Sequence, residues 1–234
     1  MQGLLVRVAV DSTAGEWNGP VDPETREFVY VPIPEQPERV RPGHERKYAE
    51  CEPALRQMGL GLPSWLAPSR PMHLDPDFEN LTYGDCTPRG NPIRSMQDGD
   101  FLVFYAGLRS VRPPENLVYA IIGFYEVAEV VTAEDVPECR WGENAHTRRL
   151  ENRGDVIVRA KPGRSGRCTR CIPIGEYRNS SYRVTPALLE RWGDISANDG
   201  FIQRSAVLQR FLHSDRFMEW FRGQDVVLVE DNSQ

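Results

Sequence analysis

The sequence predicts an α+β fold: a curved, mostly antiparallel sheet or partial β-barrel, flanked by helices, with a helical C-terminal third. Residues 98–109 and 117–131 are two long β-rich stretches separated by a polar loop with two prolines, which predicts a pair of antiparallel strands. Beyond residue 185 the apolar spacing becomes that of short amphipathic helices. Because neither a repeat nor a clear linker interrupts the 234 residues, we expect one domain over residues 1–234.

The N-terminal part of the chain contains two predicted strands. Residues 4–10 (LLVRVAV) alternate around Arg7, and a turn-rich segment follows them. Residues 27–34 (EFVYVPIP) are β-branched and aromatic, and their two prolines place the end of this strand at a sheet edge. The proline-rich residues 35–71 contain one expected short helix around 46–58, although Pro53 falls inside it.

The central and C-terminal parts continue this pattern. Gly123, in the middle of the second long strand, indicates a bulge or a close backbone approach. Residues 155–160 predict a strand, and 161–175 a basic loop that enters a short strand. A helix is expected to begin after Thr185 as its cap, with Pro186 at its first position. Residues 200–224 predict two short helices broken near Ser214, and residues 225–231 predict a final strand.

Composition favours a soluble globular protein. The chain is 40% hydrophobic and 26% charged, and no apolar run approaches the roughly 18 residues of a membrane span. The N-terminal residues lack the basic leader of a signal peptide, so we expect a cytoplasmic protein without a membrane partner. Five scattered cysteines predict reduced thiols, and the CTRC motif at 168–171 lacks the second cysteine pair typical of structural zinc sites.

Charge is spread unevenly along the chain. The net charge is −6, yet residues 140–183 contain eleven basic and four acidic residues, a net of +7. Such asymmetry predicts a face for an anionic partner. The Walker, Rossmann and Gly-x-Ser-x-Gly signatures are missing from the sequence, so we do not expect nucleoside triphosphate hydrolysis.

The segment DSTAGEWNGPVD (11–22) directly follows the first predicted strand. Its side chains are of the kinds that read base edges and sugars, with one indole for stacking; the candidates are Asp11, Ser12, Thr13, Trp17 and Asn18. The alternative is a turn-rich connection in which Asp and Ser cap backbone amides.

The segment HLDPDFENLTYGD (73–85) is dense in polar groups and allows three functional interpretations. It could be a recognition loop whose carboxylates bind exocyclic amines while Phe78 and Tyr83 stack on a base. It could supply acid–base catalysis from carboxylates with different environments, and the catalytic candidates, with Asp11 from the preceding segment, are Asp11, Asp75, Asp77 and Asp85. It could also hold a metal, because His73 and Asp75, joined by His146, would give two histidines and one carboxylate for iron. The structural alternative is a water-exposed turn cluster, although four carboxylates so close together need a compensating cation or substrate.

Two further segments provide binding candidates. In FYAGLR (104–109) we expect Tyr105 to face the site and Arg109 to pair with a carboxylate or phosphate, the alternative being a surface arginine. In NAHTRRL (144–150) the paired arginines beside a histidine suit a phosphate clamp, or else a solvated basic face; the candidates there are Asn144, His146, Arg148 and Arg149. The glycines and arginines of 161–167 could also approach an anion.

Segments of this sequence resemble two known groups of proteins. GDFLVFY followed by YAIIGFYEVAEVV resembles the PUA-like superfamily, small β-barrels that hold RNA or a modified base, with the core expected at about 98–175. Five segments, VAVDSTAGEWNGPVDPETREFVYVPIPE, HLDPDFENLTYGD, GDFLVFYAGLR, NAHTRRL and IPIGEYR, together resemble the third family of nucleotide modification associated domains. That resemblance implies bacterial or phage nucleic-acid or nucleotide chemistry and brings no assigned reaction.

We therefore expect a protein that encloses one base in an acidic and aromatic pocket, with DNA favoured over RNA, or with a free nucleotide as ligand. If it is an enzyme, carboxylate acid–base chemistry needs no organic cofactor. We expect no cofactor and no bound metal. The rival is a non-catalytic reader of a modified base. A third possibility, a partner-binding protein, would require the C-terminal aromatic residues to form an exposed patch.

Overall fold

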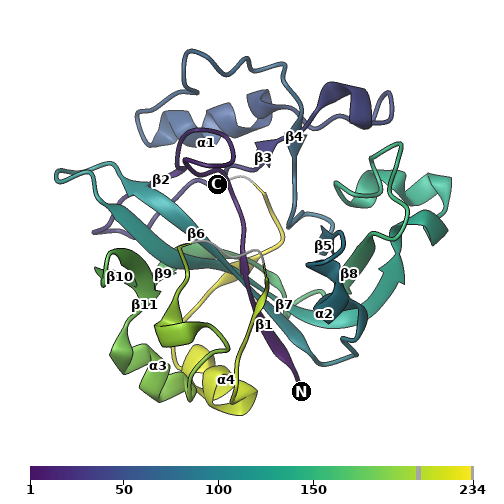
Figure 1. Cartoon of the computed structure of the whole chain (residues 1–234). Helices are drawn as coiled ribbons and strands as arrows, with labels where there is room; N and C mark the ends of the chain where they lie inside the picture. Colours follow the sequence, from purple (N-terminus) through teal and green to yellow (C-terminus); the bar gives the residue numbers. More distant parts are fainter. Residues whose placement is uncertain (204–206, 233–234) are drawn as a thin grey trace.

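The computed structural model describes residues 1–203 and 207–232, and a large mixed sheet crosses its centre (Figure 1). Its strands are β1 (Gly3–Arg7), β2 (Pro20–Val21), β3 (Ile33–Pro34), β4 (Met72–His73), β5 (Thr82–Asp85), β6 (Phe101–Ser110), β7 (Leu117–Thr132), β8 (Val156–Ala160), β9 (Gly166–Pro173), β10 (Gly175–Arg178), β11 (Ser181–Val184), β12 (Gln209–Arg210) and β13 (Leu228–Val229). The α-helices are α1 (Glu52–Gln57), α2 (Gly90–Arg94), α3 (Pro186–Trp192) and α4 (Ser214–Arg222). The 3-10 helices are η1 (Pro37–Arg39), η2 (Tyr48–Cys51), η3 (Ala133–Asp135), η4 (Glu138–Glu143) and η5 (Asn198–Gly200).

The predicted pair of long strands is present as the antiparallel hairpin β6–β7. β6 also pairs in parallel with β1 and β2, so the sheet is mixed rather than purely antiparallel. The outer edge of the long β7 is shared, because β9 pairs with its first half and β8 with its second half. Over the described residues the main path runs β12-β1-β6-β7-β8-β5 and does not close into a barrel.

The core lies on both faces of this hairpin, which explains why β6 reads as a nearly continuous apolar run. Gly123 has the role that the sequence indicated: the register shifts beside it, and a Cβ there would lie 2.5 Å from the ring of Phe78. Phe78 is consequently buried against Phe104 and Tyr125. A ring held in this way has no face available for a base. The prediction that Phe78 stacks on a base is therefore wrong.

The C-terminal third is mixed and not simply helical. α3 begins as expected, since Thr185 Oγ1 accepts a hydrogen bond from the Leu188 amide, and α4 starts at Ser214. The helix expected before Ser214 is not seen among the described residues of 200–213, of which 204–206 lie outside the description. β12 instead pairs with the edge of β1, where backbone hydrogen bonding outweighs helical propensity.

The C-terminal aromatic residues belong to the core. Phe217 stacks on Phe101, and Phe221 stacks on Phe124. Phe211 and Trp220 are buried with them. Burial of these rings removes the exposed apolar patch that a partner-binding protein would have needed there.

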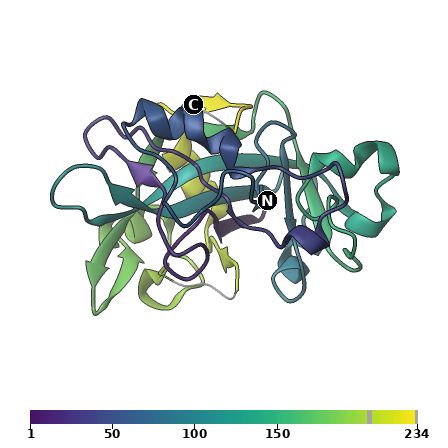
Figure 2. The same ribbon diagram turned by 90° about the horizontal axis from the view of Figure 1, so that it is seen from above.

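The helix expected around residues 46–58 is present as η2 followed by α1. Pro53 stands in the first turn of α1, where its missing N–H has no helical partner to lose. Viewed from above, the chain is elongated, with the η3–η4 segment at one end (Figure 2). Among the described residues, no helix combines the length and the apolar character that crossing a bilayer requires.

Candidate functional site

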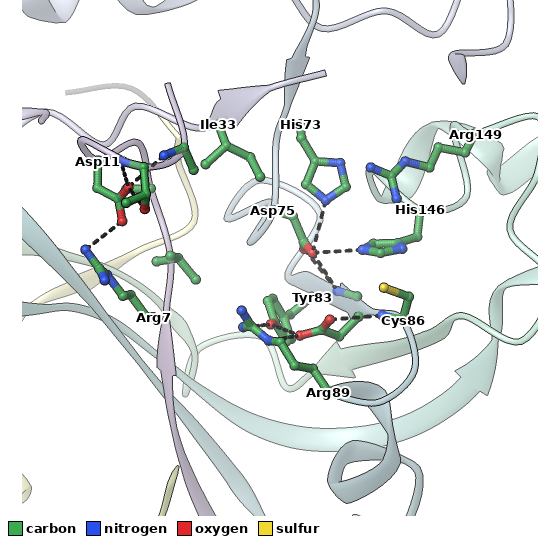
Figure 3. Close-up of a pocket in the computed structure, with 16 residues that line it drawn as sticks. Arg7, Asp11, Ile33, His73, Asp75, Tyr83, Cys86, Arg89, His146 and Arg149 are labelled. Carbon is green, nitrogen blue, oxygen red and sulfur yellow. Dashed lines mark hydrogen bonds and ion pairs between the residues drawn. The ribbon is translucent and has the colours of Figure 1, made fainter. Parts of the chain in front are cut away.

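A pocket of about 590 Å³ lies where three distant parts of the chain meet (Figure 3). They are the end of β1 with the loop after it, the β4–β5 segment with the loop that follows, and the turn after η4; Ile33 of β3 completes the lining. The ionisable residues among those lining it are Arg7, Asp11, His73, Asp75, Tyr83, Asp85, Cys86, Arg89, His146 and Arg149. Most sites that bind small molecules have volumes of roughly 300–1,000 Å³, so the pocket can hold a nucleotide-sized ligand.

Sheet pairing brings these segments together. β4 pairs with β3, which aligns His73 with Ile33, and β5 pairs with β8, which aligns Asp85 with Val156. Gly84, in β5, must lack a side chain: a Cβ there would lie 2.5 Å from the His146 ring and 2.7 Å from Asn144 Oδ1. The turn after η4 can therefore pack directly against the β5 backbone.

Two imidazoles and one carboxylate face one another on one wall of the pocket. Nε2 of His146 lies 3.5 Å from Oδ2 of Asp75, and Nε2 of His73 lies 3.9 Å from the same oxygen. The two rings are almost perpendicular, at 76°, with their centroids 4.9 Å apart. All three side chains are at least nine-tenths buried, so neighbouring groups rather than bulk water set their orientation.

Each histidine of this group contacts a second carboxylate through its other ring nitrogen. Nδ1 of His73 lies 2.8 Å from Oε2 of Glu35, and Nδ1 of His146 lies 2.6 Å from Oδ2 of Asp155. These contacts direct the Nε2 atom of each ring toward Asp75.

Asp75 is itself held by two donors. The Gly84 amide donates to both of its carboxylate oxygens, at 3.0 and 3.1 Å, and the Asn144 side-chain amide donates to Oδ1 at 3.0 Å. Asn144 also accepts a hydrogen bond from the His146 amide through its Oδ1 atom. Asn144 therefore positions both Asp75 and His146.

The two histidines have different protonation preferences. Burial lowers the pKa of His73, and the Glu35 contact offsets this only in part. Burial also disfavours the charged form of His146, but the hydrogen bond to Asp155 and the nearby carboxylate of Asp75 outweigh it and raise its pKa to about 9. Between its two carboxylates, His146 favours the imidazolium form at neutral pH.

Glu35 stays ionised in this environment. Burial opposes its charge, but the hydrogen bonds from His73 and Arg149 outweigh burial and lower the pKa of Glu35 to about 2. Arg149 contributes through Nε and Nη2, both 2.8 Å from Oε2 of Glu35. Glu35 thus links Arg149, which lines the pocket, to the buried face of His73.

A second polar group lies next to Asp75, on the same strand as the Gly84 amide that binds Asp75 (Figure 3). The Tyr83 hydroxyl donates to Oδ2 of Asp85 at 2.7 Å, and Arg89 contacts both residues, with Nε 3.0 Å from the same oxygen. Burial, reinforced by Asp85, raises the pKa of Tyr83 well above its ordinary value. The phenol therefore stays protonated and acts as a hydrogen-bond donor.

Asp11 forms the end wall. It pairs with Arg7 at 2.6 Å, and Oδ1 accepts hydrogen bonds from Thr13 and from the Ala14 amide. Burial alone would raise the pKa of Asp11, but the Thr13 hydrogen bond and Arg7 lower it. The turn-capping interpretation of residues 11–14 is therefore correct, and the same carboxylate also lines the pocket.

Seven of the candidates from the sequence line this pocket, and Asn144 supports it from behind. The seven are Asp11, Thr13, Asp75, Tyr83, Asp85, His146 and Arg149. His73, which the sequence raised only as a metal ligand, belongs to the same group. The spacing His-x-Asp was its only local signal.

Other candidates lie elsewhere because their side chains have structural partners. Asp77 is fully buried in an ion pair with Arg148, which removes both from solvent. The Tyr105 hydroxyl donates to the Ile202 carbonyl in the core, so this side chain does not face the site as expected. Arg109 is exposed and donates to the Glu115 carbonyl rather than to a carboxylate.

The remaining candidates from the first loop also lie outside the pocket lining. Asn18 donates to the Gly107 carbonyl at 2.7 Å, which uses its amide to join the loop to β6. Trp17 packs half-buried against the core, and Ser12 is exposed. No aromatic cage therefore forms from Trp17 and Tyr105.

Most basic residues of the segment 140–183 form ion pairs with carboxylates of the same chain. At least eight of its eleven basic residues form ion pairs with described residues: Arg140, Arg148, Arg149, Arg159, Lys161, Arg164, Arg178 and Arg183. The predicted anion loop at 161–167 is occupied in the same way, since the Gly163 amide donates to Glu230. Carboxylates of the same chain therefore offset much of the positive charge of this segment.

Sequence reasoning missed several residues of the site. Glu35 and Asp155 orient the histidines but belong to no motif, while Arg7, Arg89 and Cys86 line the pocket without any distinctive spacing. Only the pairing of distant segments reveals them.

Comparison with known proteins places the chain in a family. A search of curated proteins and a search of solved structures each gave no significant match. The family model described as nucleotide modification associated domain 3 matches residues 2–228. With nearly its whole length matched, the chain belongs to the nucleotide modification associated domain 3 family.

Proposed function

We propose that this protein is an enzyme of nucleic-acid or nucleotide modification that holds one base in the pocket of Figure 3. Family membership supports a role in nucleic-acid modification. The observation that carries the proposal is the convergence of Asp11, the His73–Asp75–His146 group and the Tyr83–Asp85–Arg89 group on one cavity of about 590 Å³.

The arginines at the pocket suit a phosphate-bearing ligand. Arg149 contacts Glu35 through Nε and Nη2, and Arg89 uses Nε and Nη2 on Asp85 and Tyr83. A guanidinium has five N–H donors, so each arginine keeps donors for a phosphate oxygen. We infer that these arginines bind the phosphate of the ligand.

The lining favours an enzyme over a reader of modified bases. A reader requires stacking surfaces and few ionisable groups, yet Tyr83 supplies the only six-membered aromatic ring among the described residues that line this pocket. The pocket instead contains three aspartates and two imidazoles, with the pKa values of Asp11, His73 and His146 shifted. Shifted groups gathered in a cleft are typical of catalytic sites.

A binding experiment tests the ligand. Deoxynucleoside monophosphates and the matching nucleosides are titrated against the protein by calorimetry in EDTA-containing buffer. Because a hydrogen bond to a charged group contributes about 1.5–3 kcal/mol, Arg149→Met should weaken nucleotide binding about 10- to 100-fold and nucleoside binding much less. Arg56→Met, an exposed arginine on α1, serves as the matched control and should change neither.

A product experiment tests the reaction. Single-stranded and duplex DNA are incubated with the protein and digested, and the nucleosides are compared by mass spectrometry with those from Asp75→Asn. We expect a change in nucleoside mass that depends on Asp75. If the folded protein binds no nucleotide, nucleoside or oligonucleotide, the proposed function is wrong.

A further inference from the structure

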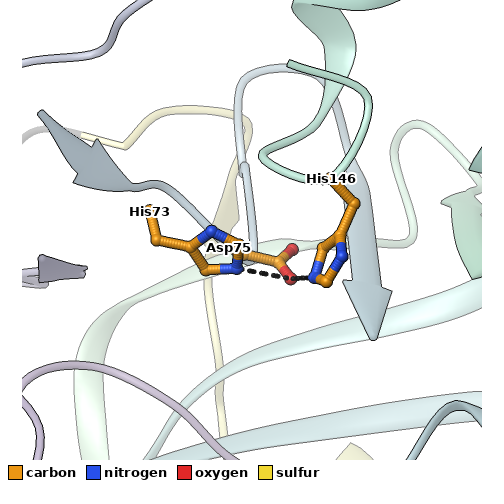
Figure 4. A group of neighbouring side chains, drawn as sticks. All are labelled: His73, Asp75 and His146. Carbon is orange, nitrogen blue, oxygen red and sulfur yellow. Dashed lines mark ion pairs between the residues drawn. The ribbon is translucent and has the colours of Figure 1, made fainter. Parts of the chain in front are cut away.

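The geometry points to a metal site: we propose that His73, Asp75 and His146 bind one divalent transition-metal ion through the two Nε2 atoms and a carboxylate oxygen. The three donor atoms lie within 4.8 Å of one another, and Figure 4 shows both imidazoles turned toward Asp75. Binding itself is independent of the proposed function; a role for the ion in the reaction rests on it.

The separations between the donors suit an ion. Contacts of 3.5 and 3.9 Å between the Nε2 atoms and Asp75 exceed the 2.7–3.2 Å typical of a hydrogen bond. Neighbouring ligands about 2.1 Å from an ion lie roughly 3.0 Å from one another in an octahedral site and roughly 3.4 Å in a tetrahedral one. Small rotations of two rings would therefore bring all three donors into bonding distance.

The outer contacts are those that metal-binding histidines need. A ligating imidazole usually donates its other N–H to a carboxylate or a carbonyl, which fixes the tautomer and the ring orientation. Glu35 provides this contact for His73, and Asp155 provides it for His146. Binding of the ion would displace the Nε2 proton of His146. Asp75 is in turn held by Gly84 and Asn144, so the site is preorganised on every ligand.

The donor set favours a particular class of ion. Imidazole nitrogen selects zinc, iron, nickel or copper over magnesium and calcium, which prefer oxygen ligands. Two histidines and one carboxylate with open positions are typical of mononuclear Fe²⁺ sites. All three ligands line the pocket, so the open positions would face the bound base. We therefore take Fe²⁺ as the favoured ion.

The experiment measures binding without any nucleotide. Metal-depleted full-length protein is titrated anaerobically with Fe²⁺, and separately with Co²⁺, Zn²⁺, Mn²⁺ and Mg²⁺, while bound metal, visible absorption of Co²⁺ and melting temperature are recorded. We expect one equivalent of a transition metal, a raised melting temperature and no competition from Mg²⁺. His146→Asn and Asp75→Asn should abolish stoichiometric binding, whereas His44→Asn, outside the pocket, should retain it.

Substitutions of Glu35 and Asp155, which contact the two histidines, test the proposal even if a variant of a metal ligand fails to fold. Glu35→Gln and Asp155→Asn should keep the stoichiometry and weaken affinity about 10- to 100-fold. Failure of the folded wild-type protein to bind any of the transition metals would overturn the proposal, as would binding that survives Asp75→Asn. Because nucleotide titrations are done in EDTA, a failed metal site and a failed base pocket give separate results.

Discussion

Arg148→Met separates a structural arginine from a phosphate-binding one. Arg148 is 4% exposed, and its Nη2 donates to Asp77, which is 0% exposed. Removing one partner of a buried ion pair typically costs about 3–5 kcal/mol because the other charge stays buried and uncompensated. Asp77 keeps hydrogen bonds from the Asn80 and Asn232 side chains and an ion pair with Arg46 at 3.8 Å, so we expect a loss near the lower limit, about 3 kcal/mol.

The assay is urea unfolding followed by circular dichroism, combined with calorimetry. Unfolding free energies are commonly about 5–15 kcal/mol, so such a loss is a large fraction of the total. At about 2–4 °C per kcal/mol for a chain of this size, the melting temperature should fall by about 6–12 °C. The double variant Asp77→Asn/Arg148→Met removes both charges and should recover part of the loss. Arg56→Met, with its side chain 68% exposed, should unfold like the wild type.

Either of two results would refute this reasoning. The first is that Arg148→Met unfolds like the wild type but binds nucleotide more weakly. Arg148 would then be a phosphate-binding residue, as its position in the sequence predicted. The second is a double variant no more stable than the single one, which would show that the pair does not act as a buried unit.

The remaining predictions concern the pocket. Gly84→Ala should weaken metal binding at least about 10-fold and cost about 1–3 kcal/mol of stability, because its Cβ would displace His146 and Asn144. Gly61→Ala is the control, since a Cβ there meets nothing within 4 Å. Equal effects of the two substitutions would contradict this prediction. Burial, and to a lesser extent Asp85, raises the pKa of the Cys86 thiol. In a Cys139→Ser background, the rate of Cys86 alkylation by iodoacetamide should therefore increase with pH, with a midpoint above the pKa of a free thiol. A midpoint below that of a free thiol would contradict the raised pKa. Binding of single-stranded DNA should weaken with salt with a logarithmic slope of about −2, from three pocket arginines at about −0.7 each; a slope near −5 would instead mean that the basic segment 140–183 contacts phosphate.

Local sequence determined several parts of this protein without help from the fold. The β6–β7 hairpin, the bulge and close packing at Gly123, and the Thr185 cap of α3 follow from residues near one another in the chain. The family follows as well, because its motifs are short stretches of residues. Such features depend on backbone preferences and on side-chain spacing, both of which can be read in a window of a few residues.

Tertiary structure alone decided which polar residues meet. Asp75 and Asp77 are two residues apart in one motif, yet Asp75 lines the pocket while Asp77 is buried against Arg148, 71 residues away. Glu35 and His73, 38 residues apart, are joined by the pairing of β3 with β4. Most basic residues of the segment 140–183 likewise form ion pairs with carboxylates, and their charge pattern along the chain did not identify these partners. A side chain's chemistry is a local property, but its partners are set by strand pairing and packing across the whole chain.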